Sequence, residues 1–421
     1  MSIQARTESK LIARLASVIF LLYFLFSVDR GNIGFAGQQM SAALGMNAAM
    51  FGLGSSLFTL SYLLFQVPNA IGLRRIGGGR AFAAIASAWG AISAATALVP
   101  SQRWFLVNRF LLGVAEAGFN AFVIYYINQV FPRSVRGFAV GIIFVAVPAS
   151  MIIVSPLSGL LLNWRFYQLQ GWQLMFIIEG LPSIVIGLLC LRLIPDGAAR
   201  MNFLTIDERN WLDTELRTGE ATLPVSTAQD LWSSFRSPTL WALGFVLFAS
   251  VFAVNVMLVW MPQMIRQMSD AGNLGVGFLN AIPWLALGCG CLLMSRLSDK
   301  VRNRMAPLRS AFAIAALGFV LAGLLQDQHP VFGFAGLTMG AFGIGAAQGL
   351  FWVVVMEFVT GRSAAAAYAF IGVLGNGSGV FAHPLIGWLH DVTGSFAGAA
   401  WALAGFSAAA IGTIALLART I

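Results

Sequence analysis

Charged residues are scarce in this chain. Asp, Glu, Lys and Arg make up only 10% of its 421 residues, against about 25% in soluble domains, and the mean hydropathy is +0.81. An ordinary soluble fold is therefore excluded, and an integral membrane protein is predicted. Histidine and cysteine are also rare, with three of each. They form no metal-ligand set and no nucleophile–base pair, so we expect neither an enzyme nor a metal or other cofactor. Cys190, Cys289 and Cys291 fall in apolar runs, where we expect small buried side chains.

Long apolar runs occupy most of the chain. They are about 18 residues or longer, which favours membrane-spanning helices over the alternating pattern of a membrane barrel. We expect twelve spans, at approximately 12–39, 50–71, 81–99, 104–129, 137–162, 172–194, 239–262, 275–296, 307–325, 330–357, 364–388 and 396–418. The expected fold is all-α, with a six-helix half at 1–194, a linker at 195–238 and a second half at 239–421.

The linker and two short loops carry further signals. Thr205 to Glu208 has the form of a capping box before Trp211 and Leu212, which predicts a short amphipathic helix on the membrane surface. A second such helix is expected around 230–235. The loops GLRRIGGGR (72–80) and SRLSDKVRNR (295–304) occupy the same place in each half, as is typical of transporters built from parallel repeats.

Basic residues predict the orientation. The isoelectric point near 10.2 would suit a nucleic-acid partner, but the basic residues lie in short loops, so no nucleic acid is expected. If both termini are cytoplasmic, 20 of the 25 Lys and Arg residues lie inside and three lie outside. This bias predicts a multi-pass protein of the plasma (inner) membrane with cytoplasmic termini. Because no cleavage site follows the first apolar run, we expect it to remain as the first helix.

Four ionisable residues fall inside two early spans. Asp29 and Arg30 are adjacent in the first, and Arg109 and Glu116 lie seven residues apart in the fourth, close to two helical turns on one face. Each costs about 2.5–3.5 kcal/mol at the centre of a membrane helix, so we expect them to share a polar cavity. A structural ion pair between Asp29 and Arg109 is the alternative for these two.

The charges of these four residues also suggest a chemistry. They sum to zero when all are ionised, and a proton on Glu116 makes the sum +1. A cluster of charge +1 suits one carboxylate of a solute, which an arginine fork can hold with two hydrogen bonds. The residues therefore predict binding of an organic anion that depends on a proton.

Five sequence motifs resemble those of one family. They are VDRGNIGFAG (28–37), RFLLGVAEAGF (109–119), FPRSVRGFAVG (131–141), GWQLMFIIEGLPSIVIG (171–187) and FLTIDERNWL (203–212). Together they resemble the anion:cation symporter family of the major facilitator superfamily. The resemblance implies proton-driven uptake of organic anions by alternating access.

The resemblance also implies roles for single residues. Asp29 and Glu116 match the proton-coupling positions, and Arg30 and Arg109 match the anion-binding ones. Tyr62 and Asn376 stand where polar substrate contacts are usual. The implied gating loops carry Arg75, Arg80, Asp299, Arg302 and Arg304.

Two departures from the family pattern stand out. The first gating loop, from Leu73 to Ile76, lacks the usual acid, and Asn120 replaces a proline that often follows the fourth-span motif. The second half has no ionisable side chain deep in its spans, so its share of the cavity must be neutral. Gln348 and Trp352 are our candidates there, with Asn255, Trp260 and Phe351 as further ones.

Other functions compete with proton-coupled import. A facilitator or an anion exchanger fits the same residues, whereas a membrane sensor would carry a signalling domain that the sequence lacks. We expect a monomer whose partners are a small organic anion, protons and the lipid bilayer. Sugar acids, aromatic acids and small hydroxy acids all fit a carboxylate site.

Overall fold

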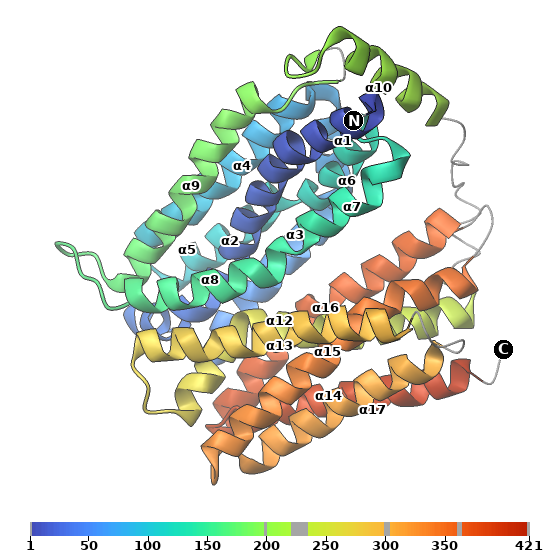
Figure 1. Cartoon of the computed structure of the whole chain (residues 1–421). Helices are drawn as coiled ribbons and strands as arrows, with labels where there is room; N and C mark the ends of the chain where they lie inside the picture. The colour runs from blue at the N-terminus through green and yellow to red at the C-terminus, as the bar shows by residue number, and fades with distance from the viewer. Residues whose placement is uncertain (1, 198–199, 220–234, 299–303, 360–363, 419–421) are drawn as a thin grey trace. The chain divides into compact units, whose positions relative to one another are not determined.

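The described part of the chain contains twelve helical spans that are long and apolar enough to cross a membrane, and Figure 1 shows their helices. The computed structural model describes residues 2–197, 200–219, 235–298, 304–359 and 364–418. In order, the spans are Ile3–Leu44 (α1, η1 and α2), Ala48–Ile76 (α3), Gly78–Leu98 (α4 and η2), Gln102–Val130 (α5 and α6), Arg133–Leu161 (α7 and α8), Gly171–Leu193 (α9), Pro238–Met268 (α12), Asn273–Met294 (within α13, Asn273–Ser298), Met305–Leu325 (α14), Pro330–Phe358 (α15), Ala366–Thr393 (within α16, Ala364–Thr393) and Ala397–Leu417 (α17). The all-α prediction of twelve transmembrane helices is confirmed, and several helices run longer than expected.

The chain forms two compact units. Unit 1 comprises Met1–Asn32, Ser61–Met151 and Arg165–Leu223, and unit 2 comprises Ile33–Leu60, Ile152–Trp164 and Pro224–Ile421. The boundaries cut through α2, α3 and α8, so segments 33–60 and 152–164 pack with the later part of the chain. The division into six-helix halves at 1–194 and 239–421 stays a prediction.

Glycines explain how these early segments join unit 2. A Cβ atom on Gly34 would lie 2.5 Å from the Leu258 carbonyl oxygen, and one on Gly52 would lie 2.3 Å from that of His383. A Cβ on Gly159 would lie 2.4 Å from the Asn273 oxygen. Only glycine lets helix backbones approach this closely, as small residues do at membrane helix interfaces.

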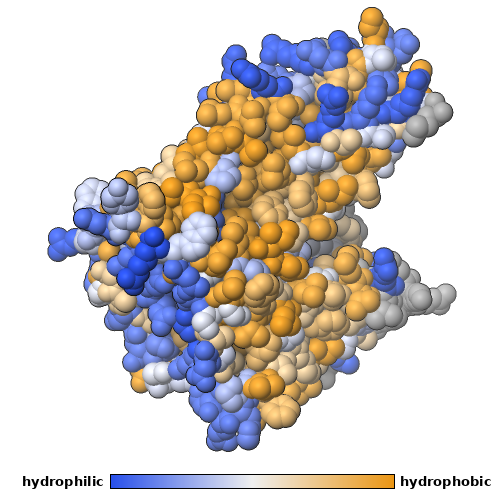
Figure 2. Space-filling model, turned by 60° about the vertical axis from the view of Figure 1, so that its left-hand side comes forward, coloured by the Kyte–Doolittle hydropathy of each residue, from blue (hydrophilic) through white to orange (hydrophobic). Residues whose placement is uncertain are grey.

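Apolar side chains cover the sides of the helices, and polar ones gather near the helix ends on the face shown in Figure 2. Leu64, Val67 and Leu188 are more than half exposed, as a lipid-facing surface requires. The cysteine prediction was right only in part. Cys190 is buried, whereas Cys289 is exposed and Cys291 is half-buried, because the last two lie on an outward face of α13.

Aromatic rings fill the core of unit 1. The ring of Phe119 lies 4.7 Å from that of Phe26 and 5.0 Å from that of Trp89, measured between centroids. Phe82 adds edge contacts to Phe119 and Phe122 at 6.2 and 5.0 Å. Such offset and edge-on pairs add about 0.5–1.5 kcal/mol each beyond the area they bury. The cluster fixes α2, α4 and α6 beside one another.

The fourth span is interrupted. We expected a span at 104–129, and within it α5 (Gln102–Glu116) ends at Glu116 and α6 (Phe119–Val130) begins at Phe119. Between them Gly118 has φ +90°, a left-handed conformation that favours glycine. A Cβ there would also lie 2.8 Å from the Ala70 amide nitrogen. The expected span is therefore present as Gln102–Val130, with a break in its helix that we did not expect.

The linker contains the predicted amphipathic helix, α10 (Ile206–Gly219). The capping box is present, since the Thr205 N–H donates to Glu208 Oε2 at 2.8 Å and the Glu208 N–H donates to Thr205 Oγ1 at 3.3 Å. Lys10 Nζ contacts both oxygens of the same carboxylate, at 2.7 and 2.9 Å, and so ties α10 to α1 (Figure 1). The Lys10 ammonium and the Thr205 N–H hold the pKa of Glu208 below its ordinary value. The helix expected around 230–235 lies almost wholly outside the described residues.

Candidate functional site

An ion pair inside unit 1 is the centre of the site. Arg30 of α2 donates from Nε to Glu116 Oε2 of α5 at 2.9 Å. Glu116 is fully buried, whereas the Arg30 side chain keeps 24% of its surface exposed. The carboxylate is therefore closed off from solvent, and Arg30 is the member of the pair with exposed surface.

Two aromatic rings hold the guanidinium of Arg30. Its central carbon lies 4.3 Å from the centroid of Phe26, one turn earlier in α2, and 4.4 Å from that of Tyr62 in α3. Cation–π contacts of this kind are worth up to about 2 kcal/mol each where water is excluded. Asn120 Nδ2 donates to the Tyr62 hydroxyl at 3.1 Å. Asn120, which departs from the family pattern, thus fixes the Tyr62 ring beside Arg30.

Asp29 lies on the buried side of the ion pair. Its Oδ1 accepts hydrogen bonds from the Ser93 hydroxyl in α4 and from Asn32 Nδ2, the latter at 3.4 Å. Among the described residues, Asp29 Oδ2 and Glu116 Oε1 are both buried without a hydrogen-bond partner, and the two carboxyl groups lie within electrostatic reach of each other. Two buried carboxylates repel each other, and a proton on one of them removes this repulsion, so the arrangement is suited to holding a proton.

Arg109 completes the cluster from α5. Its side chain is only 2% exposed, and it lies within electrostatic reach of both Asp29 and Glu116. Arg109 and Glu116 lie on one face of α5, as expected, because both side chains belong to the same buried cluster. The expected cluster of four is present within unit 1, with Arg30 and not Arg109 at its accessible edge.

The helix break lies beside Glu116 and is braced by α3. Ending α5 at Glu116 leaves backbone carbonyls of its last turn without partners in the helix. Asn69 Nδ2 donates to one of them, the Val114 oxygen, at 2.7 Å. Sequence reasoning missed Asn69, Ser93 and Phe26. Only the one-turn spacing of Phe26 from Arg30 was visible beforehand, because the others depend on which helices pack together.

The predicted contacts of the second half lie in unit 2. Asn376 is exposed and donates from Nδ2 to the Gly372 oxygen of its own helix at 2.9 Å. Trp352 is 40% exposed and packs edge-on against Phe351 at 5.2 Å. Gln348 is half-buried in α15. A role of these residues in substrate binding stays a prediction.

The gating-loop residues fall into two groups. Arg75 and Arg80 are exposed at the ends of α3 and α4, and Arg304 pairs with Glu357 at 3.2 Å in unit 2. Asp299 and Arg302 lie outside the described residues. A gating role of these residues stays a prediction. Near the first loop, an acidic residue from another segment, Asp196, lies just after α9. Its Oδ1 accepts a 3.4 Å hydrogen bond from the Gly79 N–H at the start of α4.

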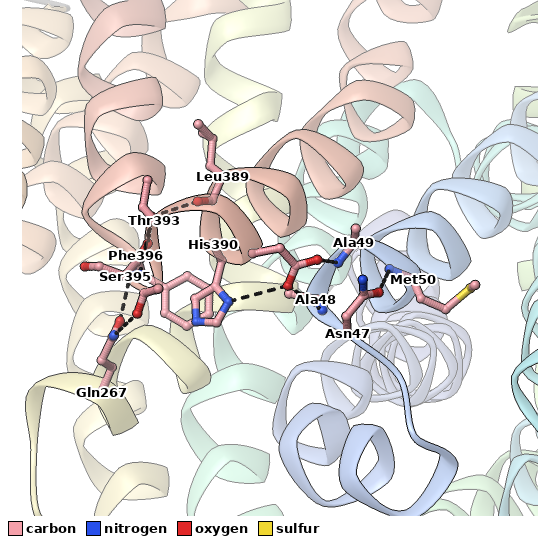
Figure 3. Close-up of polar contacts among 12 residues, drawn as sticks. Asn47, Ala48, Ala49, Met50, Gln267, Leu389, His390, Thr393, Ser395 and Phe396 are labelled. Atoms are coloured by element: carbon pink, nitrogen blue, oxygen red, sulfur yellow. Dashed lines mark hydrogen bonds and ion pairs between the residues drawn. The ribbon is translucent and has the colours of Figure 1, made fainter.

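Unit 2 contains a second polar cluster, where α16 meets the start of α3 (Figure 3). The Asp391 carboxylate accepts hydrogen bonds from the N–H groups of Ala48 at 3.0 Å and Ala49 at 2.8 Å. Asn47 Oδ1 caps the same helix through the Met50 N–H at 2.9 Å. A carboxylate at a helix N-terminus stabilises it by about 0.3–1 kcal/mol through the helix dipole. Further along, Ser56 of α3 donates to the Val380 oxygen of α16 at 2.7 Å.

Known proteins match this chain over nearly its whole length. The profile of the Major Facilitator Superfamily matches residues 19–383. A putative tartrate transporter of Agrobacterium vitis is 33% identical over 99% of this chain and 96% of its own. A quinolone resistance transporter of Acinetobacter baumannii is 33% identical over 91% and 88%.

A solved structure shares the fold. A bacterial homologue of the human lysosomal transporter Spinster, in an inward-facing and occupied conformation, superposes with a TM-score of 0.76 at 18% identity, covering 97% of each chain. Proteins of this fold move solutes across membranes and are not enzymes. The chain belongs to the Major Facilitator Superfamily, and within it to the permeases of anion:cation symporter type.

Proposed function

We propose that this protein is a secondary active transporter that imports an organic anion together with protons by alternating access. The observation that carries the proposal is the Arg30–Glu116 ion pair, whose carboxylate is buried against Asp29 while its guanidinium remains reachable. The bias of basic residues supports cytoplasmic N- and C-termini in the plasma membrane.

Arg30 is the substrate clamp. In the resting site its Nε is occupied by Glu116, and the guanidinium plane is held between Phe26 and Tyr62. A proton on Glu116 removes the charge that competes for Arg30. The fork then binds a substrate carboxylate, and the loaded cluster is again neutral. A neutral cluster costs less to carry through a low-dielectric environment than a charged one.

Asp29 and Glu116 carry the proton. The positive charge of Arg109 favours one negative charge on this pair, so the two carboxyl groups are not protonated together. A proton shared between two carboxyl groups is bound more tightly than one on an isolated group. Release on the inner side follows when the substrate leaves and Arg30 returns to Glu116. Proton and anion thus bind and leave together.

Alternating access requires contacts in unit 2 to open. The cap of Asp391 on α3 and the hydrogen bond from Ser56 to Val380 hold α3 against α16. We place this cluster on the outer side, which the proposed topology assigns to the start of α3. Separating the two helices there would admit substrate from outside.

The substrate class is an organic acid with at least one carboxylate. The relative named for tartrate supports this class, and so does Arg30, the arginine with exposed surface in the four-residue cluster of unit 1. Neutral side chains of the second half, among them Gln348, Trp352 and Asn376, would distinguish one acid from another. These three remain the positions at which we expect substrate specificity to be encoded.

Proteoliposome uptake tests the proposal. Purified protein would be screened by thermal shift against a panel of organic acids, and the best ligand would be labelled. Uptake driven by an inward proton gradient, and abolished by a protonophore, is the expected result. Equal rates with and without the gradient would favour a facilitator or an exchanger.

The similarity to a quinolone resistance transporter favours export as the second candidate. The same vesicles separate the two directions. A proton gradient that drives labelled solute against the proton flow would indicate an antiporter that exports, and would overturn the proposed symport.

A further inference from the structure

A cavity lies at the C-terminal end of α9, the end that lies nearer to α10 in Figure 1. It has a volume of about 700 Å³ and is lined by residues of three segments of unit 1: the first span, the last turn of α9 and the start of the linker. Arg14 is 16 residues before Arg30 in the first span, about 24 Å along a helix. The cavity is therefore separate from the transport site.

Three arginines line this cavity: Arg14, Arg192 and Arg200. Arg200 is paired with Asp196 at 2.7 Å, and this pair leaves a net charge of +2 from the other two. All three side chains are exposed to the cavity or to solvent. Arginine forks match the geometry of phosphate oxygens and stay charged at every physiological pH. The charge and the donors therefore select a phosphate group.

Arg14 is held in place by local structure. It lies in η1 (Ile12–Ala16), a π-helical turn inside the first span, and such turns frequently occur at functional sites. Its guanidinium lies 5.5 Å from the ring centroid of Phe203 on the linker. This contact keeps the charge at the wall of the cavity.

The wall toward α9 is apolar and faces outward. Leu191 and Leu193 line the cavity and are 54% and 48% exposed. On a membrane-spanning helix such exposed leucines face lipid acyl chains. The cavity thus offers phosphate-binding arginines directly beside a surface for hydrocarbon chains, a combination that a free phosphate ion does not use.

We propose that this cavity binds the headgroup of an anionic phospholipid. The phosphodiester group contacts Arg14 and Arg192, and the acyl chains lie along the outward face of α9. Basic pockets at the end of membrane helices have this chemistry in general. The bound lipid would join the first span, α9 and the linker, the three segments that line the cavity.

Lipid titration of the purified full-length protein tests this proposal. Binding of dioleoyl phosphatidylglycerol and of dioleoyl phosphatidylcholine would be compared by native mass spectrometry and by the shift in unfolding midpoint. The double variant Arg14→Gln/Arg192→Gln should lose phosphatidylglycerol binding by about 25-fold, about fivefold for each arginine. The matched double variant Arg6→Gln/Arg217→Gln removes the same charge from exposed positions outside the cavity and should bind as the wild type does.

A lysine variant and a competition with inorganic phosphate complete the experiment. Arg14→Lys/Arg192→Lys retains the charge without the fork and should give an intermediate loss, which covers the case in which the glutamine variant fails to fold. Equal affinity for the two lipids, or equal losses in both glutamine variants, would overturn the proposal. Displacement of the lipid by millimolar inorganic phosphate would assign the cavity to a soluble phosphate and overturn its lipid part.

Discussion

Glu116→Gln separates proton coupling from substrate binding. In the proposed mechanism a substrate carboxylate displaces Glu116 from Arg30, where the 2.9 Å hydrogen bond joins two charged groups. Such a bond is worth about 1.5–3 kcal/mol, against about 0.5–1.5 kcal/mol for a neutral partner. The midpoints of these ranges differ by about 1.25 kcal/mol, which corresponds to about eightfold, or close to one order of magnitude. We therefore expect Glu116→Gln to bind substrate about tenfold more tightly at neutral pH, with little remaining pH dependence.

The same change should abolish accumulation. One proton carried with one anion stores about 1.4 kcal/mol for each unit of imposed pH gradient, so a gradient of two units supports about 100-fold accumulation in the wild type. Glutamine cannot release a proton, and Glu116→Gln should not accumulate substrate above the outside concentration. Exchange of labelled for unlabelled substrate needs no net proton movement and should survive.

Both activities would be measured in one preparation of proteoliposomes. Glu179→Gln is the matched control, since Glu179 is also a buried glutamate of unit 1 but lies in α9, and it should retain driven uptake. Accumulation near 100-fold in Glu116→Gln would refute the role of Glu116 as a proton carrier. Loss of uptake and exchange together would instead identify a structural brace.

Four further predictions follow from the geometry. Arg30→Lys keeps the charge but loses the fork, and should weaken substrate binding by about 10- to 100-fold in a thermal-shift titration, whereas unchanged affinity would remove Arg30 from the site. Gly118→Ala forces a side chain into φ +90° and should destabilise the protein by about 1–2 kcal/mol, whereas Gly137→Ala, with open space around it, should leave the unfolding midpoint unchanged or raised. Asp391→Asn weakens the cap of α3 and should increase the labelling from outside of cysteines introduced between α3 and α16. The pKa of Glu208 is lowered in the folded protein. Its contribution to stability is therefore complete above the ordinary glutamate pKa and is lost as pH falls through the lowered pKa. The difference in unfolding midpoint between the wild type and Glu208→Gln should close on acidification, and a difference that stays constant would contradict this.

The sequence alone predicts that the four ionisable residues form a cluster. It does not predict which acid pairs with which base. The high cost of a charge inside the membrane made it necessary that Asp29, Arg30, Arg109 and Glu116 meet, and helical periodicity placed the last two on one face. Which acid pairs with which base depends on how α2 rotates against α5, and neither cost nor periodicity determines that. The structure shows Arg30 hydrogen-bonded to Glu116, and it places Arg109 within electrostatic reach of Asp29, the pairing that we weighed as a structural one.

The break between α5 and α6 could not be predicted from the sequence, for a related reason. In a soluble helix a change in apolar periodicity marks an end, but a membrane span is apolar on several faces and carries no such mark. Glycine is also common in membrane helices, so Gly118 gave no signal by itself. In the structure the break at Gly118 is accompanied by Asn69 of α3, whose Nδ2 donates a hydrogen bond to the Val114 carbonyl oxygen near the end of α5. Contacts of this kind depend on tertiary packing and have no local sequence signature.

The helix α3 carries residues of both polar clusters. Near its start, the N–H groups of Ala48 and Ala49 are capped by Asp391. Tyr62, 14 residues after Ala48, contacts Arg30, and Asn69, 21 residues after Ala48, donates a hydrogen bond to the end of α5. Coupling through α3 is therefore an expectation of the proposed function. Opening of the Asp391 cap should change the contacts of Tyr62 and Asn69, and a proton on Glu116 should change the contact of Tyr62 by releasing Arg30. Two sites are coupled in this way when each of them biases the position of one shared element.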